Sequence, residues 1–261
     1  MGMAQLQQLP APFDFDDALI AATGDKFAYC QGKYLLKPPA GHRIVACRRL
    51  TDAATFAGIL DRYETKYPGA DRRAVASMWS MHYFSTLMIS AAVHHLALRK
   101  TLPLGLADLS VVLDPNTAEP RAFVLAHTGV DCTRGPVHAS LGCVVRDHAE
   151  PLVEAMSGHA RLAKKLLWTN VSAYLSWIIK EIGHQVDPSL SVEGLVLVNE
   201  PVWPDGWKNP MFGMIRVARQ QCGLEFSNRK ICCLRYALPG VSGCGDICPL
   251  PHGHVPAAVL N

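Results

Sequence analysis

The longest uncharged stretch of the chain lies between Arg73 and Arg99. Its 25 residues are enough to cross a bilayer as a helix. The stretch is too polar for a single span facing lipid on every side, because serine, threonine and histidine recur through it: Ser77, Ser80, His82, Ser85, Thr86, Ser90, His94 and His95. His82, Thr86, Ser90 and His94 are spaced four apart and would form one stripe on a helix. The pattern predicts a long amphipathic core helix after Asp71.

Shorter patterns predict the elements around this helix. Thr51 is placed to cap a helix that runs through Tyr63 and ends before Pro68. Residues 109–113 and 122–125 are apolar and suited to strands, and Asp-Pro-Asn-Thr between them predicts the turn of a hairpin. From His148 to Ile182 the pattern is helical again, with a second apolar run from Leu166. Residues 202–211 predict a loop with aromatic anchors.

These elements mix helices with a few strands and show no regular alternation of the two. The sequence has neither a glycine-rich dinucleotide-binding motif nor a P-loop, and it has no Gly-x-Ser-x-Gly elbow. We therefore expect an α+β, helix-dominated fold with a short cysteine-rich region at the C-terminus. The aromatic loop predicts the boundary between a body, residues 1–210, and a small terminal segment, residues 211–261.

Composition narrows the class of protein further. The chain has 261 residues, 49% of them hydrophobic, and a net charge of +3, as expected for a globular protein of one or two domains. With 18% charged residues it lacks the excess of lysine and arginine needed to neutralise many phosphates, so we expect no nucleic-acid partner. The first 26 residues have no secretory pattern, which predicts a reducing, cytoplasmic location.

The nine cysteines fall into two groups. Five are scattered and are best explained as small buried apolar residues: Cys30, Cys47, Cys132, Cys143 and Cys222. The other four lie within 17 residues near the C-terminus: Cys232, Cys233, Cys244 and Cys248. Little chain entropy is lost in closing so short a loop, and its glycines allow it to wrap around a compact inorganic centre.

Four kinds of site are compatible with this cluster: an iron-sulfur centre, a tetrahedral zinc site, a redox disulfide, and unrelated buried thiols. The adjacent pair Cys232-Cys233 favours a centre with two irons, because consecutive side chains diverge. Residues 216–261 carry five basic side chains against Glu225 and Asp246, and this positive charge would stabilise a reduced, more negative centre. The alternatives stay open on these grounds.

The stretch from Arg229 to Tyr236, followed by Pro239-Gly240, Cys244-Gly245 and Cys248-Pro249-Leu250, resembles the C-terminal signature of the FhuF family of [2Fe-2S] ferric siderophore reductases. The resemblance implies that Cys232, Cys233, Cys244 and Cys248 are the metal ligands of a [2Fe-2S] cluster. The ten residues between the second and third cysteines match the family, but three residues precede Cys248 where the family usually has two. Weaker similarity extends upstream, to Trp79 and to Trp168-Thr169-Asn170.

The resemblance also implies an activity. The protein would pass one electron to Fe(III) held by a siderophore and so release Fe(II) for iron assimilation, with no catalytic residue beyond the cluster and with substrate-binding residues unknown. The implied partners are a ferric siderophore and a reductant such as a ferredoxin, a flavodoxin or an NAD(P)H-dependent reductase. Peripheral contact with the inner face of the cytoplasmic membrane is also expected. Arg229, Lys230 and Arg235 would tune the cluster or contact a partner.

Three other hypotheses remain. One is a non-enzymatic helical binding module with a structural four-cysteine zinc site. Another is kinship to the siderophore synthetases, against which the missing phosphate loop argues. In the third, His252 or His254 replaces a thiol as in Rieske-type centres, although a solvated tail explains both histidines better.

Overall fold

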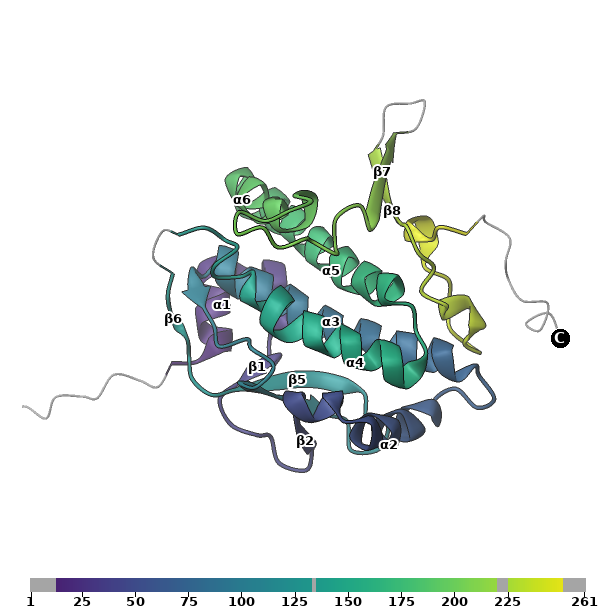
Figure 1. The fold of residues 1–261 in the computed structure, drawn as a ribbon. Coiled ribbons are helices and arrows are strands. Elements are labelled where there is room, and N and C mark those ends of the chain that lie inside the picture. Colours follow the sequence, from purple (N-terminus) through teal and green to yellow (C-terminus); the bar gives the residue numbers. More distant parts are fainter. Residues whose placement is uncertain (1–12, 133–134, 220–224, 251–261) are drawn as a thin grey trace, which may run out of the picture.

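The computed structural model describes residues 13–132, 135–219 and 225–250. Helices dominate and pack on one side of a small sheet (Figure 1), which confirms the α+β prediction. The helices are α1 (Phe15–Thr23), α2 (Ala53–Glu64), α3 (Arg72–Leu96), α4 (Glu150–Ala160), α5 (Lys164–Gln185) and α6 (Pro188–Asn199). The strands are β1 (Tyr34–Leu35), β2 (Arg43–Ala46), β3 (Lys100–Thr101), β4 (Leu109–Leu113), β5 (Pro120–Leu125), β6 (Val130–Asp131), β7 (Ile215–Arg219) and β8 (Glu225–Arg229).

The largest sheet has the strand order β1-β5-β4-β2. Its centre is the antiparallel hairpin β4–β5, which confirms the predicted hairpin, although β5 begins at Pro120 rather than at residue 122. The Asp114 carboxylate forms the turn, because it accepts hydrogen bonds from the backbone N–H groups of Asn116 and Thr117 at 3.0 and 2.9 Å. The sequence therefore specified this element locally.

Helix α3 is the central element of the body. It begins after Asp71, as predicted, and packs against β5 on one side and α5 on the other. The predicted polar stripe does not form a solvated face, since Ser90 and His94 are buried. The His94 Nδ1–H instead donates to the Ser90 carbonyl at 2.8 Å, which satisfies part of the stripe within the helix. Among the described helices, none is long and apolar enough to cross a membrane.

One local prediction was wrong. The cap of α2 is Asp52 rather than Thr51, because the Asp52 carboxylate reaches the Thr55 N–H at 2.8 Å. The helical pattern predicted from 148 to 182 is confirmed and is divided between two helices, α4 and α5. Arg161 has a left-handed φ of 52° after α4, and Ser157 Oγ donates to the Leu162 carbonyl at 2.7 Å, which stabilises the break.

After α5 the chain continues through α6, a loop and a hairpin to the cysteine-rich segment. Helix α6 packs tightly on α5, since a Cβ at Gly194 would lie 2.8 Å from Ile179 Cγ2. The loop predicted over 202–211 is present, and Trp203 is buried against Trp207 within it. The antiparallel hairpin β7–β8 then projects from the helical layers (Figure 1). The boundary at residues 210 and 211 stays a prediction.

Candidate metal centre

The four clustered cysteines lie on irregular backbone just after β8. Cys232 and Cys233 follow the strand, and Cys244 and Cys248 lie at the two ends of the short 3₁₀ helix Gly245–Ile247, which packs on β8. The Sγ atoms of Cys233 and Cys244 are 3.1 Å apart. The Leu234 backbone N–H points at Cys232 Sγ at 3.4 Å, a direction that its left-handed φ of 62° permits. The segment thus brings Cys233 and Cys244 into contact and directs an amide at a third sulfur.

The thiols also interact electrostatically. The hydrogen bond from Cys244 lowers the pKa of Cys233 to about 6; burial opposes this shift and the Arg229 charge assists it. The same hydrogen bond, together with burial, raises the pKa of Cys244. Burial raises the pKa of Cys232, and Cys248 adds to it by charge repulsion. The contact therefore favours one thiolate and one thiol in the metal-free pair.

A chain of hydrogen bonds joins the cysteine segment to the body. Ser77 Oγ of α3 donates to the Cys233 carbonyl at 2.7 Å. Behind it, the Asn170 side-chain amide of α5 donates to Ser80 Oγ at 2.8 Å and accepts a hydrogen bond from the Arg229 guanidinium. Ser80 Oγ in turn donates to the Ser77 carbonyl at 2.7 Å, so the chain is continuous. Two buried helices hence fix the backbone that carries Cys233.

Arg229 is only 1% exposed, and its Nε has no hydrogen-bond partner among the described residues. Of the two roles expected for the basic residues, this burial favours tuning of the cluster over contact with a protein partner at the surface. The weak upstream matches are buried too: Trp79 donates its Nε1–H to the Ala118 carbonyl at 3.0 Å, and Trp168 is 5% exposed. Neither tryptophan is free to meet a substrate.

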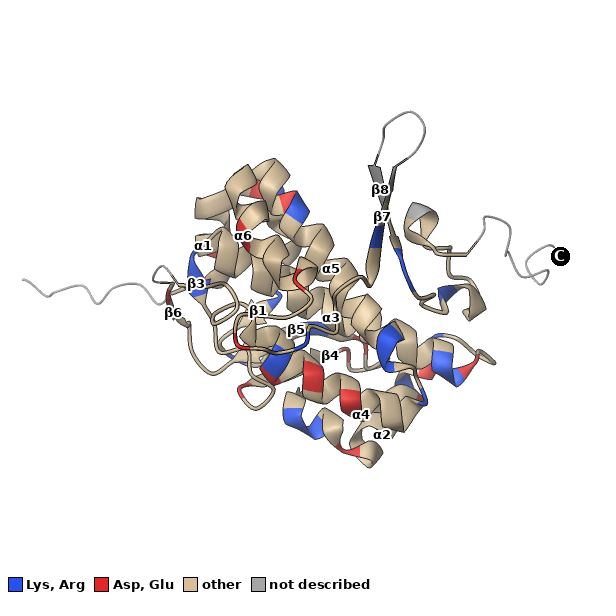
Figure 2. Cartoon of the chain, turned by 45° about the horizontal axis from the view of Figure 1, so that its top comes forward, with Lys and Arg blue, Asp and Glu red and all other residues tan. Residues whose placement is uncertain are grey.

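A cavity of about 580 Å³ opens beside Cys244. Helices α3 and α5 form one wall and the C-terminal segment forms the other. Among the described residues that line it, three are cationic and none is acidic: Met81, Ile89, Ala173, Tyr174, Ser176, Trp177, Lys180, Ile215, Ser227, Asn228, Arg229, Arg235, Gly243, Cys244 and Ile247. Lys and Arg also gather on the hairpin and the segment after it, where the described side chains include no Asp or Glu (Figure 2).

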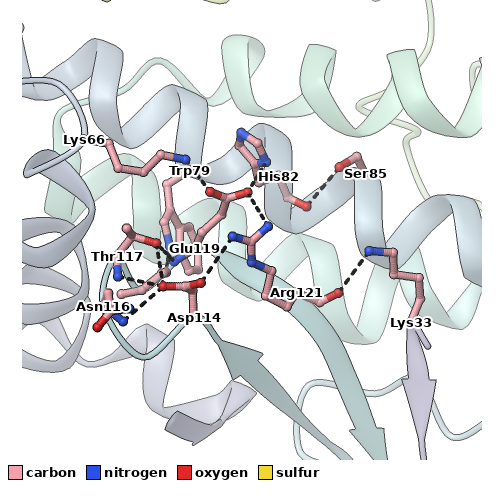
Figure 3. A network of polar contacts seen from close by, with 11 residues as sticks. Lys33, Lys66, Trp79, His82, Ser85, Asp114, Asn116, Thr117, Glu119 and Arg121 are labelled. Carbon is pink, nitrogen blue, oxygen red and sulfur yellow. Dashed lines mark hydrogen bonds and ion pairs between the residues drawn. The ribbon is translucent and has the colours of Figure 1, made fainter. Parts of the chain in front are cut away.

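A second polar cluster lies at the β4–β5 turn (Figure 3). Glu119 forms an ion pair with Lys66, and its Oε1 lies 3.4 Å from His82 Nδ1 and 3.2 Å from Arg121 Nη1. Burial raises the pKa of Glu119, but these three groups outweigh it and the net shift is downward. Because the Glu119 carboxylate is paired with these groups, the cluster ties the turn to the segment after α2 and to α3, and its ion pairs need no ligand to explain them.

The described residues contain no group of three His, Cys, Asp or Glu side chains arranged to hold one metal ion. The cysteine segment does fit a [2Fe-2S] cluster by the chemistry of its donors. It supplies four soft thiols, a backbone N–H directed at sulfur, and the buried positive charge of Arg229 close to Cys233. These features define a candidate iron-sulfur protein.

Comparison with known proteins identifies the family. The family model described as "Ferric iron reductase FhuF-like transporter" matches residues 77–225, more than half of the chain, and the model described as "FhuF 2Fe-2S C-terminal domain" matches residues 229–250. The chain belongs to the FhuF family, and its cofactor is a [2Fe-2S] cluster. The resemblance inferred from the sequence is thereby confirmed.

One named relative is similar to this chain over part of the relative's length. The ferric siderophore reductase of Escherichia coli (strain K12) is 33% identical over 98 residues. The match covers 37% of this chain and 35% of the relative, so the chain spans about a third of that protein's length in this comparison. The activity of the whole relative therefore enters only as a proposal below.

Sequence analysis identified all four cysteines but missed their anchors. Ser77 and Ser80 were noticed only as polar positions in an uncharged helix, and nothing in the sequence linked them to Cys233. Of the residues that line the cavity, Lys180 went unnoticed, and Trp177 was interpreted only as part of an apolar helical run. Cys222, His252 and His254 lie outside the described residues.

Proposed function

We propose that this protein is a ferric siderophore reductase in which Cys232, Cys233, Cys244 and Cys248 hold the [2Fe-2S] cluster. The observation that carries the proposal is the contact of Cys233 Sγ with Cys244 Sγ at 3.1 Å, inside the segment that matches the family's cluster domain. In this proposal residues 1–210 form the body and residues 211–261 form the cluster-binding segment.

The cluster, when bound, supplies one electron at a time. The substrate is Fe(III) chelated by hard oxygen donors, and one added electron converts it to Fe(II), which the same donors bind far more weakly. One electron from an external reductant balances each turnover, and no proton acceptor or nucleophile of the chain is needed. The remaining task of the protein is to bring the ferric chelate close to the cysteine segment and to exclude water around it.

The basic residues divide between two tasks. Arg229 is buried behind Cys233, where its positive charge favours the reduced state, since reduction adds one negative charge. Lys230 is exposed and suits contact with an acidic electron donor such as a ferredoxin or a flavodoxin; an NAD(P)H-dependent reductase is the other class of donor we consider. We place the reaction in the cytoplasm, where imported siderophores emerge at the inner face of the membrane.

Spectroscopy and metal analysis test the proposal. Anaerobically purified, dithionite-reduced protein should give the electron paramagnetic resonance signal of a single-electron-reduced [2Fe-2S] cluster, with iron and acid-labile sulfide in equal amounts. The oxidation of that cluster by a ferric siderophore, and the appearance of Fe(II) trapped by a ferrous chelator, should follow. Colourless protein with one zinc per chain would instead support the binding module with a structural metal.

A further inference from the structure

The cavity adjoins the cysteine cluster at one residue, because Cys244 lines it and the other three cysteines do not. Its volume of about 580 Å³ lies within the range of small-molecule sites, roughly 300 to 1,000 Å³. Electron transfer needs its two partners close together, and this cavity has the Cys244 thiol in its wall. A compact ferric complex bound in this cavity would lie next to a proposed cluster ligand.

The charge of the cavity is one-sided. Lys180 and Arg235 line it together with the buried guanidinium of Arg229, and the lining side chains that the structure describes include no Asp or Glu. Lys180 Nζ donates to Ser227 Oγ of β8 at 3.2 Å, so this cation is held at the wall rather than free in solvent. The described cations of this wall attract anions, because no described carboxylate of the wall neutralises them.

Three buried polar atoms of residues that line the cavity have no hydrogen-bond partner among the described residues. They are Arg229 Nε and Arg235 Nε, which are donors, and Asn228 Oδ1, an acceptor. Buried polar groups without partners are costly, and a ligand that carries both anionic oxygens and N–H or O–H groups would satisfy them. The site is thus incomplete in a way that a polar, anionic ligand corrects.

The remaining wall is apolar and aromatic. Tyr174 and Ile215 line it, and Trp177 lies at its rim with 44% of its surface exposed. The Trp177 ring is 6.1 Å from the Tyr29 ring, so it belongs to an aromatic edge and is not an isolated exposed side chain. Such a wall suits the organic scaffold of a chelate, while the cations meet its charged oxygens.

We infer that this cavity is the substrate site and that it selects ferric chelates of net negative charge over neutral ones. Three catecholates leave Fe(III) with a net charge of minus three, and carboxylate-rich chelates are also anionic, whereas three hydroxamates give a neutral core. Lys180 and Arg235 contact the anionic oxygens and Trp177 covers the scaffold. The inference rests on the proposed reductase function, of which it names the substrate class.

Gallium chelates test the inference without any redox reaction, because Ga(III) matches Fe(III) in charge and size but is not reduced by the protein. Calorimetry at physiological salt would compare an anionic Ga(III) tris-catecholate with a neutral Ga(III) tris-hydroxamate on the cluster-loaded protein. We expect the anionic complex to bind at least tenfold more tightly. Equal affinity for the two complexes, or no binding of either, would overturn the inference.

A pair of matched variants locates the binding. Lys180→Glu should weaken the anionic complex by roughly tenfold and leave the neutral complex unchanged. Lys165→Glu makes the same charge change at an exposed position of the same helix, outside the cavity lining, and should change either affinity less than twofold. Equal effects of the two variants would mean that only the overall charge matters, which contradicts a defined site. A thermal unfolding scan establishes that both variants are folded.

The outcomes separate this inference from the proposed function. Protein with an intact, reducible cluster that binds neither gallium chelate remains a candidate reductase with a different substrate site. Protein that binds the anionic chelate at Lys180 but contains no cluster keeps the site and loses the proposed reaction. A Lys180→Glu variant that slows reduction by the electron donor without altering chelate binding would assign the cavity to that donor and overturn the inference.

Discussion

The helical body and the cysteine segment are held together by different forces. In the body, α3 and α5 bury apolar faces against each other, and most residues of α3 are inaccessible to solvent. In residues 230–250, only Cys233 and Leu238 are buried among the described side chains, and the regular structure there amounts to two 3₁₀ helices of three residues each. The body can thus fold on apolar packing, whereas the segment adds only a few apolar side chains to that core and depends more on polar contacts and on its metal.

The strongest test of this difference removes a metal ligand. Cys248→Ser should abolish the visible colour, the bound iron and the turnover, because a serine hydroxyl is a poor replacement for a thiolate on iron. The helical signal in far-ultraviolet circular dichroism should persist, since the body does not need the cluster. Cys248 is the sharpest choice because the spacing before it departs from the family. The control, Cys47→Ala, changes a buried thiol of the body and should keep the iron. A Cys248→Ser protein with full colour and rate would show that this thiol is not a ligand.

The reverse experiment weakens the body. Trp79 is fully buried, stacks on Tyr83 and donates to the Ala118 carbonyl. Trp79→Ala should lower the free energy of unfolding by about 3–5 kcal/mol and so expose the cluster to loss. Trp177→Ala, at a side chain that is 44% exposed, should cost less than about 1 kcal/mol. Urea unfolding of both variants gives the comparison, and equal losses would mean that α3 is not the core of the body.

The two regions also differ in how far the sequence predicted them. The hairpin β4–β5 and the start of α3 follow from local patterns, because an Asp-led turn and an Asp cap act on neighbouring residues. The four cysteines stand out by their spacing alone. Helix α6 was missed because it is apolar on most faces and has little periodicity, and the break at Arg161 was missed because the residue with the left-handed φ is an arginine rather than a glycine.

The anchors of the site were beyond prediction for a different reason. The hydrogen bond from Ser77 to the Cys233 carbonyl joins residues 156 positions apart, and the contact between Asn170 and Arg229 spans 59. No local pattern encodes such pairs, since they exist only after α3, α5 and β8 have packed. From the sequence alone, a serine inside an apolar helix cannot be told from an ordinary core residue, because its hydrogen-bond partner is set by tertiary packing. The cavity is likewise a product of tertiary packing.

The pH dependence of the free energy of unfolding should arise from a buried histidine of the body. His148 is fully buried; it donates Nδ1–H to the Leu104 carbonyl and accepts from Tyr83 Oη at 2.6 Å, and burial lowers its pKa to about 4. The unfolded chain binds this proton near pH 6.5, so stability is complete above that pH and falls as the pH drops through 6.5 towards 4. The loss should reach about 3 kcal/mol at most. Urea titrations at several pH values measure it, and His148→Gln should flatten the slope; an unchanged slope would assign it to other groups.

A smaller effect should appear in the redox potential. Arg229→Gln removes the buried positive charge near Cys233 and should lower the potential by roughly 60 mV, a tenfold change in the one-electron equilibrium. Arg229→Lys keeps the charge and should stay closer to the parent protein. An electron paramagnetic resonance titration against mediators measures both variants, with circular dichroism as a check on folding. Identical potentials in the Gln and Lys variants would remove the tuning role from this charge.

The smallest expected effect falls on the contact between the two regions. Ser77→Ala deletes the hydrogen bond to the Cys233 carbonyl and leaves that buried acceptor without its partner, at a cost of about 1 kcal/mol. The loss should appear locally, as faster hydrogen exchange in residues 230–250 and roughly fivefold faster cluster decay in air, because the body gains nothing from this bond. Ser85→Ala is the control: its hydroxyl donates within α3, to the His82 carbonyl at 3.0 Å. The contrary outcome is a lower urea midpoint for the whole Ser77→Ala protein with unchanged hydrogen exchange in the segment. It would mean that the segment unfolds together with the body, as part of one cooperative core.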